Sequence, residues 1–135
     1  MFRLSGTVKQ PWSSQPDTSI VRVALPRVNG APVTFAVTRC RPGAPRLTLE
    51  ELREHLSVLH GWAVADNSIE KTYPFTNYYE TMAFVNAVAY VAHQVDHHPD
   101  LGVHYNRCVV QYTTHDAGGV TLNDCICAAR IEGLV

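Results

Sequence analysis

Histidines are concentrated in one short stretch of this chain. Five of the seven lie between positions 93 and 115, and three of them belong to the run His93-Gln94-Val95-Asp96-His97-His98-Pro99. Histidine has an unperturbed pKa of roughly 6.5, so it both donates and accepts protons near neutral pH. A cluster of this density indicates acid–base chemistry, in which Asp96 could orient a ring or hold its charge.

Proton transfer without a metal explains most of this pattern. We expect a helix to end near Asp96 or His97, because the residue before Pro99 avoids helical geometry. The negative end of the helix dipole favours the imidazolium forms of His97 and His98. His115 ends a long predicted strand and supplies a third imidazole from another element. Elimination of water requires such an acid and base on opposite sides of a flat substrate.

Zinc binding is an alternative use of the same side chains. His93 and His97 are spaced i and i+4, which can place two imidazoles on one face of a helix. However, position 94 is Gln where the HExxH motif has glutamate, and neither Cys108 nor His115 shows the short ligand spacing typical of zinc sites. The pattern therefore favours proton transfer over metal binding.

Composition limits the class of protein. A chain of 135 residues with 46% hydrophobic residues forms one domain with a real core. The net charge of −1 gives no electrostatic footprint for nucleic acid, and no apolar stretch is long enough for a membrane span. The cysteines form no CxxC pair, which indicates reduced thiols in a cytoplasmic protein; they are Cys40, Cys108, Cys125 and Cys127.

Helix and strand patterns alternate from Arg46 onward. Capping residues predict helix starts at Thr48, Asn77 and Thr121, and the first of these helices ends at Gly61. Asp124 follows Thr121 by three residues, so capping alone could explain this acid. Strands are predicted at 61–64, 69–75, 102–105 and 107–114. The order predicts an α+β fold in which three helices pack on one face of a four-stranded antiparallel sheet.

Residues 1–45 form a separate, proline-rich N-terminal extension. The dipeptide Asn29-Gly30 lies between β-like runs at 20–25 and 33–37, which is typical of a hairpin. Pro26 and Pro32 interrupt these runs, so a disordered leader is the equal alternative. We therefore divide the chain into an extension, 1–45, and a domain, 46–135.

The spacing of the polar residues resembles the signature of the pterin-4a-carbinolamine dehydratases. The likeness extends from about Arg46 to Gly133 and includes Gly61-Trp62. It implies a cytoplasmic hydro-lyase that converts 4a-hydroxytetrahydropterin to quinonoid dihydropterin and so recycles the pterin of aromatic amino acid hydroxylases. It also implies a homodimer or homotetramer with no cofactor, since the pterin is the substrate. The matching pattern is His93-x3-His97-His98-Pro99-x5-Tyr105-x9-His115-x8-Asp124.

The resemblance also implies roles for single residues. The catalytic residues would be His97, His98 and His115, with no metal. We expect His97 to be the acid and His98 or His115 to be the base. The substrate-binding residues would be Asp96, His97, His98, Pro99, Thr113, Thr114, His115, Asp116 and Asp124.

Two further functions fit the same residues. Animal members of the family also serve as a dimerisation cofactor for a homeodomain transcription factor, so a non-catalytic, dimeric binding or regulatory protein is one alternative. The complete histidine set favours catalysis, because a scaffold has no need of it. The other alternative is a dehydratase-like pocket that serves a different pterin.

Overall fold

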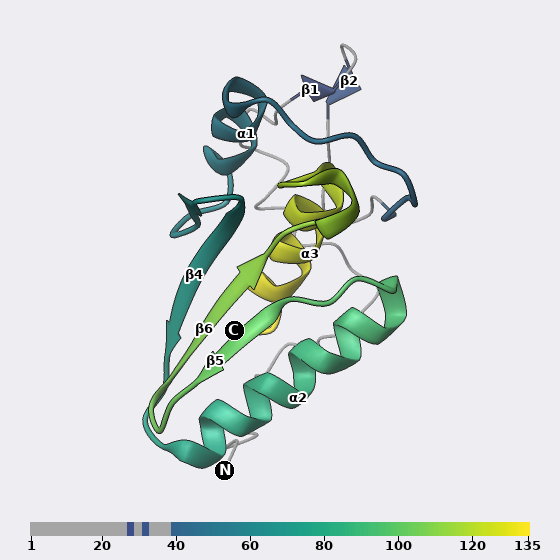
Figure 1. Cartoon of the computed structure of the whole chain (residues 1–135). Coiled ribbons are helices and arrows are strands. Elements are labelled where there is room, and N and C mark those ends of the chain that lie inside the picture. The colour runs from purple at the N-terminus through teal and green to yellow at the C-terminus, as the bar shows by residue number, and fades with distance from the viewer. Residues whose placement is uncertain (1–26, 29–30, 33–38) are drawn as a thin grey trace.

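The computed structural model describes residues 27–28, 31–32 and 39–135 (Figure 1). Within residues 39–135, three helices and four strands follow one another in the predicted order, and the α+β class is confirmed. The elements are α1 (Leu49–Leu56), β3 (Ala63–Ala65), β4 (Ser68–Pro74), α2 (Tyr78–Val95), β5 (Asp100–Val103), β6 (Arg107–Tyr112), the 3-10 turn η2 (His115–Ala117) and α3 (Leu122–Glu132).

The four strands of residues 39–135 form one antiparallel sheet in the order β3-β4-β6-β5. Its centre is the β4–β6 pair, which runs from Ile69 opposite Tyr112 to Pro74 opposite Arg107. Because Pro74 has no N–H to donate, its place at the last pair of this ladder agrees with the predicted strand end. The sheet places the end of β6, and the residues that follow it, between β5 and the start of β4.

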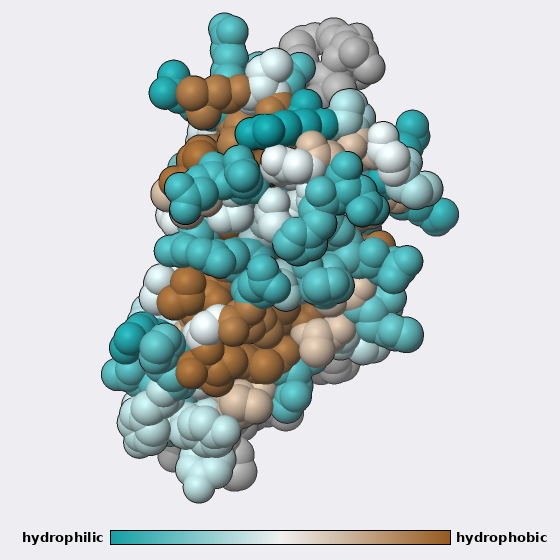
Figure 2. All heavy atoms as spheres, in the orientation of Figure 1, coloured by the Kyte–Doolittle hydropathy of each residue, from teal (hydrophilic) through white to brown (hydrophobic). Residues whose placement is uncertain are grey.

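The helices cover one face of the sheet, as predicted. Alternate residues of a strand point to opposite faces. On one face of β4 and β6 the side chains are buried, and Tyr73 packs on Phe84 of α2 with ring centroids 4.7 Å apart. The opposite face is open. In Figure 2 it carries an apolar patch over β5 and β6, below a band of polar side chains. The buried strand residues are Ile69, Tyr73, Cys108, Val110 and Tyr112.

Local hydrogen bonds fix the predicted helix starts. At α1 the N–H of Glu51 donates to Thr48 Oγ1 (3.2 Å) and the N–H of Thr48 donates to Glu51 Oε2 (2.8 Å), which completes a capping box. At α2 the N–H of Glu80 donates to Asn77 Oδ1 (3.0 Å). These bonds satisfy amides that a helix start leaves without partners.

Some predicted boundaries were wrong. α1 ends at Leu56, five residues before Gly61, because Ser57 caps it and donates its hydroxyl to the carbonyl of Glu54 (2.5 Å). Gly61 instead adopts a φ of +83° in the turn before β3. β5 begins at Asp100, two residues early, and β6 ends at Tyr112, two residues early, because pairing with the neighbouring strand sets both limits.

The N-terminal segment is described in part. β1 (Arg27–Val28) pairs antiparallel with β2 (Ala31–Pro32), on either side of residues 29–30. The predicted runs at 20–25 and 33–37 lie outside the described residues. From Arg39 the chain runs beside the start of α3, where the N–H of Leu47 donates to the carbonyl of Val120 (2.8 Å). None of the helices in the described part of the chain is long and apolar enough to cross a membrane.

Candidate active site

The end of α2 brings His97 against the start of α3. Asp96 caps α2 with a left-handed φ of 51°, which turns the chain away from the helix axis. The next residue, His97, places its Nε2 2.5 Å from Oδ1 of Asp124. Its ring stacks on Tyr112, with the ring planes 12° apart. The Asp124 side chain is fully buried and that of His97 is 16% exposed, so this pair is held inside the protein with one edge open.

Asp124 is satisfied on both carboxylate oxygens. Its Oδ2 accepts hydrogen bonds from the hydroxyl of Thr114 and from the N–H of Thr121, each at 2.8 Å. The hydroxyls of Thr114 and Thr121 lie 2.9 Å apart. Asp124 therefore caps α3 and binds His97 at the same time. The predicted cap is confirmed, and the predicted role of Asp124 in the substrate site stays a prediction.

Asp124 changes the acidity of His97. The hydrogen bond to the carboxylate raises the pKa of His97, and the charges of Asp124, Cys40 and Asp96 act in the same direction, while burial opposes them. The imidazolium thus persists to a higher pH than in a free histidine. A protonated imidazole that gives one N–H to a fixed carboxylate keeps its second N–H for a substrate, which is the arrangement of a general acid.

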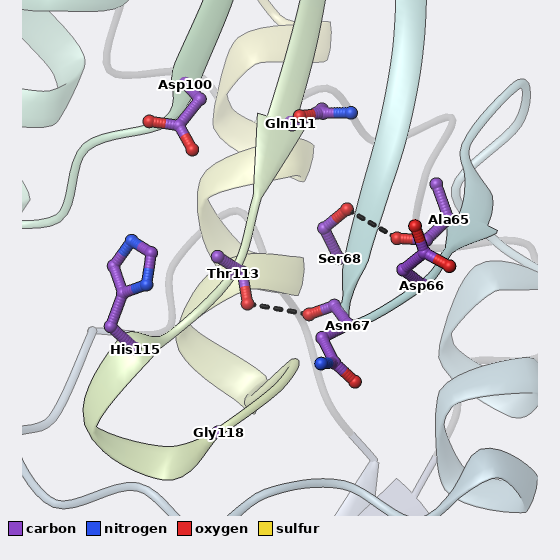
Figure 3. Close-up of a pocket in the computed structure, with 9 residues that line it drawn as sticks. All are labelled: Ala65, Asp66, Asn67, Ser68, Asp100, Gln111, Thr113, His115 and Gly118. Carbon is purple, nitrogen blue, oxygen red and sulfur yellow. Dashed lines mark hydrogen bonds between the residues drawn. The ribbon is translucent and has the colours of Figure 1, made fainter.

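A cavity of about 340 Å³ lies at the end of the sheet, within the range of small-molecule sites (Figure 3). His115 borders it on one side and Asn67 on the other, and the His115 ring points toward Asp100 in this view. The hydroxyl of Thr113 donates to the carbonyl of Asn67 (2.6 Å). The lining residues are Ala65, Asp66, Asn67, Ser68, Asp100, Gln111, Thr113, His115 and Gly118.

Two adjacent threonines join the cavity to the buried pair. Thr113 and Thr114 follow β6 in extended backbone, where successive side chains point to opposite sides. Thr113 lines the cavity, and Thr114 donates to Asp124. The segment after β6 therefore connects the His97–Asp124 pair on the helix side of the sheet to His115 on the open side.

The other predicted site residues belong neither to the His97–Asp124 network nor to the residues that line the cavity. His98 and Asp96 are exposed, and Pro99 leads into β5, whose first residue, Asp100, lines the cavity. Asp116 is exposed in η2. The structure thus brings His97, Thr114 and Asp124 together in one network and Thr113 and His115 together in one cavity. The catalytic and substrate-binding roles of all the predicted site residues stay predictions.

Several cavity residues were missed by sequence reasoning. Asp100 directly follows the His-His-Pro run, and Gln111 interrupts the apolar run from Cys108 to Tyr112, so both carried a signal. Gln111 donates to the carboxylate of Glu70 on the neighbouring strand. Asn67 lies in the turn between β3 and β4. These residues give the cavity hydrogen-bonding groups besides the histidine.

Arg46 was also missed, and it ties two sides of the cavity together. Its guanidinium donates to Oδ1 of Asn67 (3.3 Å). On the way it passes Gly119 so closely that a Cβ there would lie 2.5 Å from its Nε. Glycine at 119 is therefore needed for this approach. No spacing rule in the sequence signals such a contact.

Zinc binding is the alternative use of these side chains. Among the residues that the structure describes, no group of three or more His, Cys, Asp or Glu side chains is placed to hold a metal ion. In this described part of the chain, His93 and His97, spaced i and i+4, therefore have no third His, Cys, Asp or Glu placed to complete a metal site with them.

Comparison with known proteins identifies the family. A family model described as "Pterin 4 alpha carbinolamine dehydratase" matches residues 45–134. The chain belongs to this dehydratase family. A relative from Nitrosomonas eutropha, provisionally named as a pterin-4-alpha-carbinolamine dehydratase, is 56% identical over 105 residues, which cover 75% of this chain and 93% of the relative. One from Chromobacterium violaceum with the same provisional name is 55% identical over 97 residues, covering 70% and 90%.

A solved structure of a family member has the same fold. The structure titled transcriptional coactivator/pterin dehydratase, from Brucella melitensis, superposes with a TM-score of 0.62 at 34% sequence identity. The match covers 64% of this dehydratase-family chain and 95% of the Brucella chain. The resemblance inferred from the histidine spacing is thus confirmed at the level of family and fold.

Proposed function

We propose that this protein removes water from a 4a-hydroxytetrahydropterin to give the quinonoid dihydropterin, by general acid–base catalysis. The observation that carries the proposal is the contact of His97 with the buried carboxylate of Asp124 (2.5 Å), joined through Thr113 and Thr114 to a cavity that His115 lines. Family membership supports the same reaction.

The acid in this reaction is His97. The substrate carries a hydroxyl on C4a and a hydrogen on N5, and hydroxide is a poor leaving group unless it is protonated. The imidazolium of His97, favoured by Asp124, donates a proton to the departing hydroxyl. A neutral histidine, His115 or His98, removes the N5 proton. The N5–H electron pair then forms the C4a=N5 double bond as the C4a–O bond breaks, and water leaves.

The cavity supplies groups that can orient the pterin. A pterin ring is flat and presents N–H donors beside a carbonyl and ring nitrogens. The carboxylate of Asp100, the amide of Gln111 and the hydroxyl of Thr113 all line the cavity and match those edges in hydrogen-bonding character. In this proposal the ring lies against His115 in the cavity and extends past the end of β6 to the exposed edge of His97, which does not itself line the cavity. The dehydration rates of pterins with different side chains would show which substrate the cavity prefers.

The proposal includes the cellular setting that the family resemblance implies. The protein acts in the cytoplasm as a homodimer or homotetramer. Its substrate is formed by a pterin-dependent aromatic amino acid hydroxylase, and no cofactor takes part because the pterin is itself the substrate.

The dehydration rate tests the proposal. A hydroxylase generates the 4a-hydroxytetrahydropterin, and its decay is followed with and without the wild-type protein, the His97→Ala variant and, as a matched control, the His60→Ala variant, whose histidine is exposed. Wild type and His60→Ala are expected to accelerate the decay. His97→Ala is expected to lose about 10²–10⁴-fold of that acceleration while keeping its circular dichroism spectrum.

The alternative makes a different prediction in the same assay. The Brucella melitensis relative carries the words transcriptional coactivator in its title, so a binding or regulatory protein is the second candidate. Well-folded wild type that leaves the decay rate unchanged would reject the dehydratase proposal and favour this candidate.

A further inference from the structure

Two cysteines that are far apart in the sequence lie side by side next to the His97–Asp124 pair. Sγ of Cys40, in the segment before α1, is 3.8 Å from Sγ of Cys127 on α3. Cys127 is fully buried and Cys40 is half-buried. The remaining cysteines, Cys108 and Cys125, are buried. Cys40 is therefore the cysteine that solvent reaches most easily.

Hydrogen bonds hold the Cys40 segment on α3. The N–H of Arg41 donates to Oδ1 of Asn123 (2.9 Å), and the Nδ2 group of Asn123 donates to the carbonyl of Arg41 (2.7 Å). The thiol of Cys40 also lies 3.9 Å from the carbonyl of Asn123. The backbone beside Cys40 is thus clamped to the first turn of α3, one helical turn from Cys127. This arrangement keeps the two sulfur atoms in register.

We propose that Cys40 and Cys127 are a redox modification site, at which hydrogen peroxide converts the two thiols into an intramolecular disulfide. A disulfide bond is about 2.05 Å long, so the sulfur atoms must approach each other by roughly 1.7 Å. A side-chain rotation of Cys40, whose segment lies at the surface, can supply that movement. This inference concerns thiol chemistry and does not depend on the proposed dehydratase activity.

The surroundings of Cys40 favour its reactive form. The hydrogen bond with Cys127 lowers the pKa of Cys40 to about 7, and the positive charges of His97 and Arg130 act in the same direction. Burial and the Asp124 carboxylate oppose this shift. The thiolate is the nucleophilic form of cysteine, so Cys40 is partly activated at neutral pH.

The reaction proceeds in two displacements. The Cys40 thiolate attacks one oxygen of hydrogen peroxide, the O–O bond breaks, hydroxide leaves, and a sulfenic acid forms. The Cys127 sulfur then displaces the sulfenic hydroxyl, which leaves as water with the Cys127 thiol proton. The hydroxide takes up the proton that Cys40 had released. The sum is two thiols and one peroxide to one disulfide and two waters, and a dithiol reductant reverses it.

Oxidation also changes the charge next to the candidate acid. The Cys40 thiolate is one of the negative charges that raise the pKa of His97. A disulfide carries no charge, so its formation removes that contribution and leaves Asp124 and Asp96 to hold the imidazolium. The redox state of the pair is thereby coupled to the acidity of His97.

Thiol counting after peroxide treatment tests the proposal. The full-length protein is treated with hydrogen peroxide, denatured, alkylated with iodoacetamide and weighed by mass spectrometry under non-reducing conditions. We expect two of the four thiols to escape alkylation in a monomeric chain, and dithiothreitol to restore both. Trypsin should yield the 40–46 peptide joined to the 108–130 peptide.

Alanine variants locate the second sulfur, because Cys108, Cys125 and Cys127 share the 108–130 tryptic peptide. The cross-link is expected to persist in Cys125→Ala, a matched buried control on the same helix, and to be lost in Cys127→Ala. The pKa values of Cys125 and Cys127 are both raised, so the two variants are distinguished by the 3.8 Å contact of Cys127 with Cys40 and not by acidity. Four alkylated thiols in treated wild type, or a cross-link that persists in Cys127→Ala, would overturn the proposal.

Discussion

At the scale of single residues, Asp124 is the centre of the site. It accepts hydrogen bonds from the hydroxyl of Thr114 and from the N–H of Thr121, the residue that caps α3, and it holds the imidazole of His97. These donors hold the carboxylate in place, and its contact with His97 raises the pKa of that imidazole. One residue thus serves both folding and the proposed proton transfer.

Asp124→Asn is expected to destabilise the fold. The amide keeps the shape but replaces one acceptor oxygen with an NH₂ group, which faces a donor and leaves buried groups without partners. The expected loss in free energy of unfolding is about 3 kcal/mol, measured by urea denaturation. Asp116→Asn, at an exposed carboxylate, is the control and should change little. Equal stability of the two variants would contradict the network described for Asp124.

The raised pKa of His97 makes its contribution to stability depend on pH. A histidine with a higher pKa in the folded state stabilises fully below its unfolded pKa of about 6.5, and loses this as pH rises through the folded value. The difference in unfolding free energy between wild type and His97→Gln should therefore be larger at about pH 5.5 than at about pH 9. Buried His55 is common to both proteins, so its acid sensitivity cancels. A difference that grows with pH would rule out this shift.

At the scale of elements, the segment after β6 organises the site. Its residues Thr113 and His115 line the cavity, and Thr114 donates to Asp124. The backbone of Arg46 pairs with that of Thr121 in an isolated β-bridge. The Arg46 side chain then passes Gly119 and donates to Asn67. The Arg46 guanidinium thus binds the loop before β4 and passes close to Gly119 in the turn after β6, while Thr113 donates directly to the carbonyl of Asn67.

Gly119→Ala tests the tie between the loops. The added methyl group would lie 2.5 Å from Nε of Arg46, so the side chain must swing away from Asn67, at a cost of about 1 kcal/mol in unfolding free energy. In an Arg46→Ala background the methyl group meets no such obstacle. Thermal or urea unfolding of the two single variants and the double variant is expected to show strong non-additivity. Fully additive effects would show that Arg46 and Gly119 do not interact.

The elements also show what sequence could and could not predict. Helix starts at Thr48, Asn77 and Thr121 were predicted because capping depends on residues three positions apart. The end of α1 was missed because Ser57 competes for the last carbonyls before the glycine is reached. The His97–Asp124 contact spans 27 residues and depends on the chain reversal at Asp96. The histidine spacing identified the family, but no local pattern could supply that distance.

At the scale of the whole molecule, part of α2 and one face of the sheet carry exposed side chains among the residues that the structure describes. Large side chains remain in solvent on α2, among them Tyr79, 73% exposed, and Tyr90, 63% exposed. Exposed aromatic residues on one element are typical of surfaces that associate. These features agree with the homodimer or homotetramer that the family resemblance implies.

Light scattering on a size-exclusion column measures the assembly. A chain of 15.0 kDa should elute with a mass of about 30 kDa for a dimer or about 60 kDa for a tetramer, since closed symmetric assemblies are the rule for homo-oligomers. Tyr79→Ser together with Tyr90→Ser is expected to shift the mass downward. A wild-type mass of one chain at micromolar concentration would reject the oligomer.

The most direct test of the proposed chemistry is the dehydration rate of the His115→Gln variant, measured on 4a-hydroxytetrahydropterin beside wild type. His115 is exposed and lines the cavity, so this substitution should leave the melting temperature unchanged. We predict that the variant loses about 10²–10⁴-fold of the catalysed rate, as expected for a lost proton-transfer group. A folded variant with the full wild-type rate would contradict the assignment of the cavity as the active site.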